Sequence, residues 1–130
     1  MRWFLFGVAA LHALFMVGEL FPWSFPKLLQ KLSEKLPEGL GKEIPEGQRW
    51  TKSQQGLVAT IVHNAGIYNA ILAGGLIWAA LPEEPIRDVA RVLLMGAAVA
   101  GVFGTATLKS WFTALQALLG IIGLAWLALI

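Results

Sequence analysis

Four long apolar segments take up most of this chain of 130 residues, at about 3–22, 56–81, 88–108 and 111–130. A helix crosses the hydrocarbon core of a bilayer with roughly 20 mostly apolar residues, and each segment reaches that length. Only 14% of the residues are charged, well below the share of about 25% in ordinary soluble domains. We therefore predict an all-α integral membrane protein, a four-transmembrane-helix bundle that forms one domain over residues 1–130 in a lipid bilayer.

The longest hydrophilic stretch, residues 23–55, separates the first two spans and begins with a periodic pattern. Within 27–36, leucines recur on one helical face and lysines with long side chains flank that face. This pattern is typical of a helix that lies on a membrane surface. We predict a short amphipathic interfacial helix after the first span; a solvated helix that caps the bundle is the alternative.

Positive charges are distributed unequally between the two sides that four spans create. Seven lysines and arginines fall in residues 23–55 and in the short turn at 109–110, whereas three fall on the other side. Short loops rich in lysine and arginine stay in the cytoplasm. We therefore predict a multi-pass protein of the cell membrane with the 23–55 loop in the cytoplasm and both termini outside.

Polar side chains interrupt the apolar segments in the half that lies nearest to the 23–55 loop. His12 and Glu19 are seven residues apart and share one helical face, while Asn64 and Tyr68 are four apart and share another. Further polar residues in the same half are His63, Asn69, Thr105, Thr107 and Gln116. Ionisable side chains inside a membrane ordinarily face the bundle interior or a wet cavity. We therefore expect these groups to converge on a polar pocket that opens beneath the loop.

Small residues recur along the last three spans. They include Gly66, Ala70 and Gly74, then Ala97 and Gly101, then Gly120 and Gly123. Small residues one turn apart let membrane helices approach closely. This spacing predicts tight helix packing.

Three stretches of the sequence resemble the signatures of a known protein family: "HALFMVGELFPWSFP", "NAGIYNAILAGGLIW" and "AGVFGTATLKSWFTALQALL". They are similar to the signatures of the small four-helix membrane proteins known as the domain of unknown function 1304 family. The similar stretches cover about half of the chain, in the right order and spacing. The resemblance implies the four-helix fold and an importance for His12, Glu19, Asn64, Tyr68, Asn69, Thr107 and Gln116. It implies no activity.

We predict that the pocket binds a small amphiphilic molecule, with His12 and Glu19 orienting its polar head group. The predicted ligand-binding residues are His12, Glu19, Asn64, Tyr68, Asn69, Thr107 and Gln116, and the expected apolar walls are Phe15, Phe103 and Trp111. Two other functions are left open. One is a small dimeric proton-coupled transporter in which Glu19 titrates, and the other is an intramembrane enzyme that uses His12 and Glu19 as an acid–base pair.

A purely structural interpretation has Glu19 pair with His12 or Asn64 to fix the helix register. We predict no cofactor, and a metal site of His12, Glu19 and His63 is disfavoured because their spacing matches no ligand motif. A net charge of +2 with no basic run excludes a nucleic-acid partner. Whether the chain forms a homo-oligomer is left open.

Overall fold

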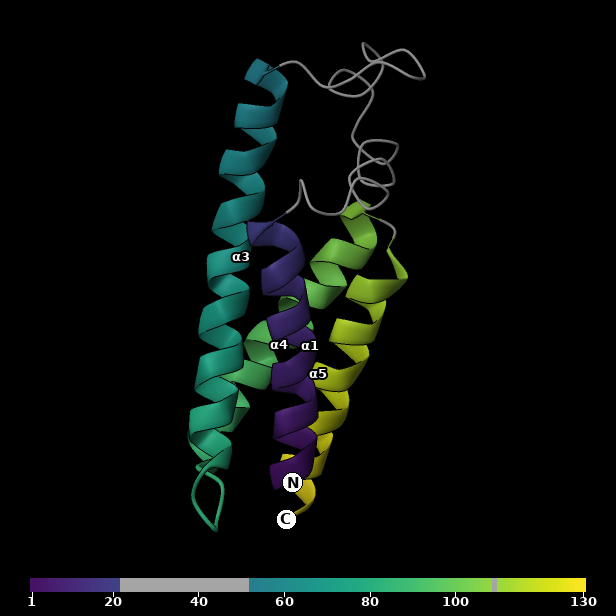
Figure 1. The fold of residues 1–130 in the computed structure, drawn as a ribbon. Coiled ribbons are helices and arrows are strands. Elements are labelled where there is room, and N and C mark those ends of the chain that lie inside the picture. Colours follow the sequence, from purple (N-terminus) through teal and green to yellow (C-terminus); the bar gives the residue numbers. More distant parts are fainter. Residues whose placement is uncertain (22–51, 109) are drawn as a thin grey trace.

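The computed structural model describes residues 1–21, 52–108 and 110–130, which form four α-helices. These are α1 (Arg2–Leu20), α3 (Lys52–Ala80), α4 (Arg87–Leu108) and α5 (Trp111–Leu129). They run side by side along the long axis of the molecule (Figure 1). The predicted all-α, four-helix fold is confirmed, whereas the amphipathic helix predicted over 27–36 lies outside the described residues.

Proline and turn residues set where the helices end. Phe21 has left the helical conformation, with φ −122° and ψ 49°, immediately before Pro22. A proline ring disfavours helical backbone at the residue before it. The segment 81–85, LPEEP, turns α3 into α4, and Asp88 then places a carboxylate in the positively polarised first turn of α4. At the start of α5, the backbone of Ser110 is extended.

The bundle consists of two antiparallel helix pairs, α1 with α3 and α4 with α5, which pack less closely against each other. Glycines bring the backbones of α4 and α5 together. A Cβ at Gly101 would lie 2.3 Å from the backbone nitrogen of Ala117, and one at Gly120 would lie 2.6 Å from that of Ala98. The tight packing predicted from small residues is thus found at these two positions. At Gly74, by contrast, no atom lies within 4 Å of an added Cβ.

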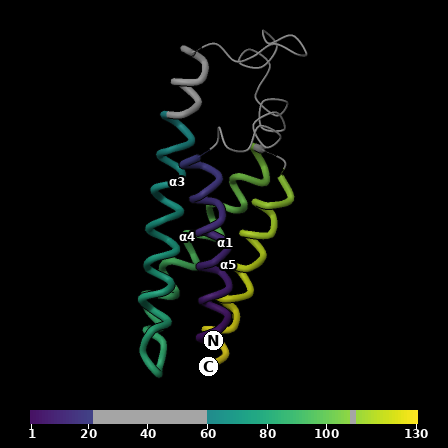
Figure 2. The backbone as a smooth tube through the Cα atoms, in the orientation of Figure 1, coloured from purple at the N-terminus to yellow at the C-terminus, as the bar shows by residue number. Residues whose placement is uncertain are grey.

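The apolar core lies in the half of the bundle that holds the two termini. All four helices contribute buried side chains to it, including Leu5, Leu76, Leu94 and Leu127. Figure 2 shows both termini and the α3–α4 turn at this same end. The polar side chains described below lie in the other half.

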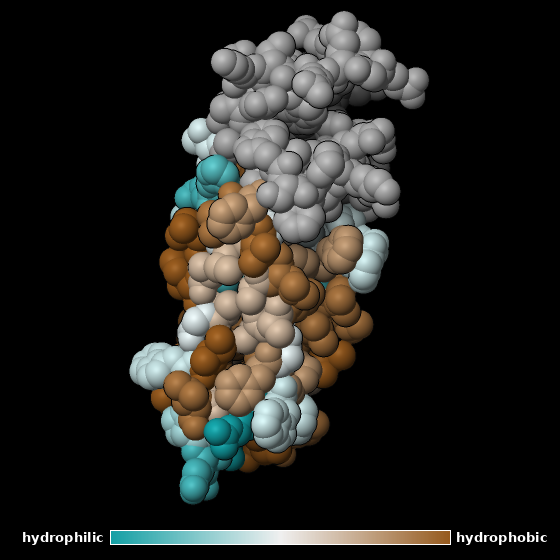
Figure 3. Space-filling view, viewed as in Figure 1, coloured by the Kyte–Doolittle hydropathy of each residue, from teal (hydrophilic) through white to brown (hydrophobic). Residues whose placement is uncertain are grey.

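The outer surface is apolar along the helices. In Figure 3 the middle of the visible face is brown and tan, and hydrophilic side chains gather toward its ends. Each of the four helices in the described part of the chain is long and apolar enough to cross a membrane. These features together indicate a membrane protein.

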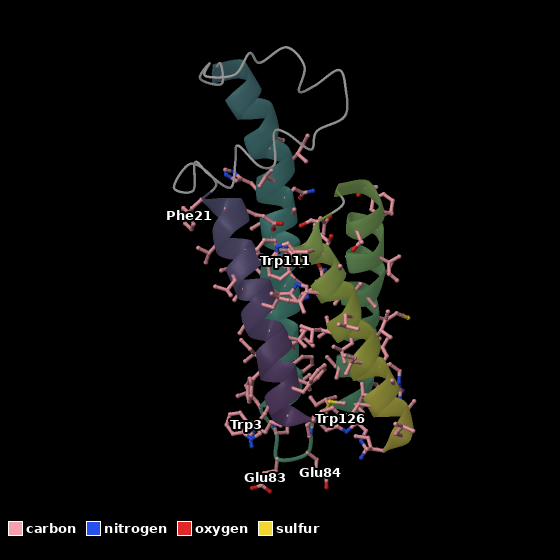
Figure 4. All side chains as sticks on the ribbon, turned by 90° about the vertical axis from the view of Figure 1, so that its right-hand side faces the viewer. Trp3, Phe21, Glu83, Glu84, Trp111 and Trp126 are labelled. Carbon is pink, nitrogen blue, oxygen red and sulfur yellow. The ribbon has the colours of Figure 1, made fainter. Side chains whose placement is uncertain are left out.

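Exposed tryptophans lie at two levels of the bundle (Figure 4). Trp3 and Trp126 lie near the end that holds the termini, with Glu83 and Glu84 beyond them, and Trp111 lies nearer to the opposite end. Indole rings prefer the two interfaces between a membrane and water. Their placement fits a bilayer around the apolar middle of the bundle.

Candidate functional site

Two side-chain hydrogen bonds join α1 to α3 in the polar half of the bundle. Asn69 of α3 lies between two residues of α1: its Oδ1 is 2.7 Å from His12 Nδ1, and its Nδ2 donates to Glu19 Oε2 at 2.6 Å. His12 and Glu19 are seven residues apart, so both can face the same neighbouring helix. We call His12, Asn69 and Glu19 the polar network.

The amide of Asn69 decides which nitrogen of His12 carries the hydrogen. Because Nδ2 donates to a carboxylate, Oδ1 is the acceptor that faces the imidazole, and His12 Nδ1–H donates to it. Nε2 of the neutral ring is then an acceptor. It is buried and has no hydrogen-bond partner among the described residues. The network therefore ends inside the bundle on an unused basic nitrogen.

Gly66 allows α1 and α3 to approach each other beside the network. A Cβ at this position would lie 3.0 Å from Leu20 Cγ and 3.3 Å from Glu19 Cβ. The glycine thus brings Glu19 within reach of Asn69, which follows three residues later on α3. The spacing of small residues predicts packing at Gly66 but gives no sign of this relation to Glu19.

The network runs from the interior of the bundle toward its surface. His12 is fully buried, and its ring meets Phe15 edge to face with 6.0 Å between the ring centroids. Glu19 is half-buried, and among the described residues only Asn69 forms a hydrogen bond with its carboxylate. A molecule that approaches from outside would therefore meet the carboxylate first.

Gln116 of α5 lies at the level of His12. The rings of Phe15 and Phe112 pack edge to face, with 6.3 Å between their centroids. This contact shows the register of the antiparallel helices α1 and α5. His12 lies about one turn before Phe15 and Gln116 about one turn after Phe112, so in antiparallel helices these two residues come to the same level. Gln116 is 7% exposed, and its side chain forms no hydrogen bond with the residues that the structure describes. The structure thus brings His12, Glu19, Asn69 and Gln116 to the polar half of the interior.

A family model for proteins of unknown function, DUF1304, matches residues 6–128. The chain belongs to the DUF1304 family. The match covers nearly the whole chain, whereas the similar stretches that carry the resemblance cover about half of it. No curated protein and no solved structure matches the chain. Membership of the DUF1304 family supplies no activity, so the function has to be argued from the site.

Three predicted site residues of this DUF1304 protein lie on the outside of the bundle. Tyr68 is 62% exposed, and Asn64 and Thr107 are exposed as well. The Thr107 hydroxyl donates to the carbonyl of Phe103 in its own helix at 2.9 Å. The expectation that these three side chains converge with the others in the interior is therefore wrong. A ligand-binding role for them stays a prediction.

The surroundings of the network also differ from the expected pocket. Phe103 and Trp111, expected as apolar walls, are exposed, and Phe15 is the expected wall that packs beside His12. Glu19 bonds to Asn69, not to His12 or Asn64 as the structural interpretation expects. A shallow open groove lies elsewhere, on the outer face of α4 and α5, and no member of the network lines it. Its lining residues are Val102, Thr105, Ala106, Ala114, Ala117, Leu118 and Ile121.

Other polar residues of the DUF1304 helices take no part in the network. Thr105 Oγ1 donates to the Gly101 carbonyl at 2.7 Å and lies 3.3 Å from Thr113 Oγ1, which links α4 to α5. His63 is half-buried, and its Nε2 has no partner within the described ranges. Nor do those ranges contain a group of three His, Cys, Asp or Glu side chains that could hold a metal ion.

Proposed function

We propose that this DUF1304 protein is a multi-pass membrane protein that binds the polar head group of a small amphiphile at Glu19. The observation that carries the proposal is a half-buried carboxylate within an apolar helix, held by Asn69 alone among the described residues. Ionisable residues inside a membrane are costly and are ordinarily functional. A carboxylate has two oxygens with several acceptor positions, so Glu19 can accept further hydrogen bonds from a ligand.

The chemistry of the network favours a cationic head group. Glu19 is its acidic member, and His12 offers a second acceptor, Nε2, deeper in the bundle. An ammonium group supplies hydrogen-bond donors together with the charge opposite to that of the carboxylate. The hydrocarbon tail of such a molecule would stay among the apolar side chains and lipids that surround the helices.

The same geometry gives less support to catalysis. An acid–base pair requires both groups to reach one substrate, but the Asn69 amide, which does not titrate, lies between His12 and Glu19. A proton-coupled transporter would also bind its substrate at Glu19, just as a binding protein would bind its ligand there. It would differ by moving protons across the membrane when substrate is added, which a pH-sensitive dye inside vesicles would detect.

Glu19→Gln is expected to weaken the binding of a fluorescent dodecylammonium probe, whose primary ammonium group can donate hydrogen bonds, while the protein stays folded. The glutamine oxygen can still accept the hydrogen bond from Asn69, but the charge is removed. Because a hydrogen bond to a charged group contributes about 1.5–3 kcal/mol, the dissociation constant should rise by at least about tenfold. The measurement is fluorescence anisotropy of the probe, used below its micellar concentration, with the full-length protein in lipid nanodiscs.

Glu83→Gln is the matched control for this experiment. It removes the same charge from an exposed residue of the α3–α4 turn, outside the network, and should leave probe binding unchanged. Thermal unfolding of both variants, followed by tryptophan fluorescence, should resemble that of the unaltered protein. Equal probe binding by Glu19→Gln and the unaltered protein would contradict the proposal.

We further propose that both termini lie outside the cell and that the 23–55 segment is cytoplasmic. The support is the excess of lysine and arginine in that segment, together with the position of both termini and the α3–α4 turn at one end of the bundle (Figure 1). A reporter enzyme that is active only outside the cytoplasm is expected to be active when fused after Ile130. Activity of a cytoplasmic reporter at the same position would reverse the topology.

A further inference from the structure

Helix α3 carries two stripes of residues on opposite sides, each with alternating spacings of three and four. One stripe faces the rest of the bundle and consists of Gly66, Asn69, Ala73, Leu76 and Ala80. The other consists of Asn64, Ile67, Ile71, Gly74 and Trp78, and all five are exposed. We call the second set the outer seam. Its spacing is that of the contact positions by which two helices pack in a coiled coil.

Each stripe contains one asparagine, but the two asparagines are in different situations. Asn69 in the inner stripe bonds to His12 and Glu19. Asn64 in the outer seam is exposed, and its side chain forms no hydrogen bond within the described part of the chain. An amide without a partner on the apolar surface of a membrane helix is costly. The described residues supply no partner for Asn64, so a partner from outside the protomer would remove this cost.

A second copy of this chain can supply that partner. An amide has both a donor and an acceptor, so two Asn64 side chains that face each other can satisfy one another. Copies inserted in the same orientation are related by a two-fold axis along the bundle, which places each residue of the seam opposite its own equivalent. A single asparagine within a helical seam is a known means of fixing register and oligomeric state.

The other seam residues are suited to the close approach of a second helix. In the described part of the protomer no contact explains a glycine at position 74, because an added Cβ would meet no atom within 4 Å. Gly74 lies between two bulky seam residues, Ile71 and Trp78, which are 60% and 58% exposed, and Ile67, one turn before Ile71, is 51% exposed. Small residues between bulky ones allow two membrane helices to make close backbone contact.

We propose that the outer seam is the interface of a homodimer, in which two parallel α3 helices pack together and the two Asn64 amides bond to each other. The proposal uses the membrane placement of α3 but not the binding of an amphiphile. It accounts for an exposed asparagine, an open glycine and two exposed isoleucines at regular spacing on one face. The polar network, on the opposite side of α3, remains within each protomer.

Disulfide cross-linking tests the interface directly, because the chain contains no native cysteine. Ile67→Cys and Ile71→Cys would each be compared with Val92→Cys and Val99→Cys, which lie seven residues apart on α4 and are 62% and 64% exposed. The full-length variants would be oxidised in lipid vesicles at increasing lipid-to-protein ratios. Cross-linked dimer should form faster at the two α3 positions and persist on dilution. Equal or faster cross-linking on α4, or loss of all cross-linking on dilution, would overturn the proposal.

Two substitutions give a second, independent measurement. Gly74→Leu fills the open position in the seam, and Gly7→Leu makes the same change at an exposed glycine of α1 that also has no atom within 4 Å of an added Cβ. Energy transfer between labelled copies in vesicles should show a dimer weakened about tenfold or more by Gly74→Leu and unaffected by Gly7→Leu. Asn64→Leu should weaken the dimer as well. Unchanged energy transfer in Gly74→Leu and Asn64→Leu would overturn the proposal, whether or not the protein binds an amphiphile.

Discussion

Asn69→Leu is expected to lower the free energy of unfolding by about 2–4 kcal/mol, because it removes the centre of the polar network and leaves two groups without partners. His12 Nδ1–H loses its acceptor, and Glu19 loses its donor. A change of tautomer does not help the imidazole, since Nε2 has no partner among the described residues either. Leucine has a similar size, so the loss of hydrogen bonds dominates over any change in packing.

Burial decides the size of this effect. Hydrogen bonds between membrane helices contribute only about 0.6 kcal/mol on average, because the separated helices find other partners. His12 is fully buried, so its freed N–H has no access to water or lipid head groups while the bundle stays folded. The cost should therefore exceed the average.

Asn64→Leu is the matched control for Asn69→Leu. It makes the same substitution on the same helix at an exposed residue with no hydrogen bond to the described residues, and should change the stability of the monomer by less than about 0.5 kcal/mol. Both variants would be unfolded in detergent, at a dilution chosen to keep the protein monomeric, and unfolding would be followed by tryptophan fluorescence. Equal loss of stability in the two variants would contradict a special role for the network.

The length and hydropathy of the segments predict the four helices well. The expected spans end within one or two residues of α1, α4 and α5, because prolines and turn residues punctuate the sequence there. The start of α3 is less well predicted: the helix begins at Lys52, before the apolar run. Hydropathy detects the part of a helix that fits in lipid, and a polar extension of the same helix carries no such signal.

Helical spacing predicts correctly that His12 and Glu19 face the same neighbouring helix. It does not predict which face of α3 turns toward the interior of the bundle. A separation of four shows that Asn64 and Tyr68 share a face, but it does not show which face turns inward. Asn64 and Asn69 lie on opposite sides of α3, and apolar residues accompany both, so composition gives no preference. Thr107 is misplaced for another reason. Its hydroxyl bonds to a carbonyl of its own helix, so it needs no partner in the interior.

Gly101→Ala is expected to destabilise the protein, although alanine is the better helix former. A Cβ at this position would meet the backbone nitrogen of Ala117 at 2.3 Å and the carbonyl oxygen of Thr113 at 2.8 Å. Backbone atoms cannot rotate away as a flexible side chain can, so α4 and α5 have to separate. Overpacking of this kind costs about 1–3 kcal/mol, more than the gain of roughly 0.5–1 kcal/mol from replacing glycine within a helix.

Gly7→Ala makes the same change where an added Cβ meets no atom within 4 Å, so only the gain in helix propensity remains. The free energy of unfolding should therefore stay the same or rise by up to about 1 kcal/mol. If Gly101→Ala lowers the free energy of unfolding while Gly7→Ala raises it, contact between the α4 and α5 backbones is a source of stability. Gly120→Ala should behave like Gly101→Ala, because its Cβ would lie 2.6 Å from the Ala98 nitrogen. If both substitutions were neutral, the two helices could move apart without loss, and their close packing would contribute little to the fold.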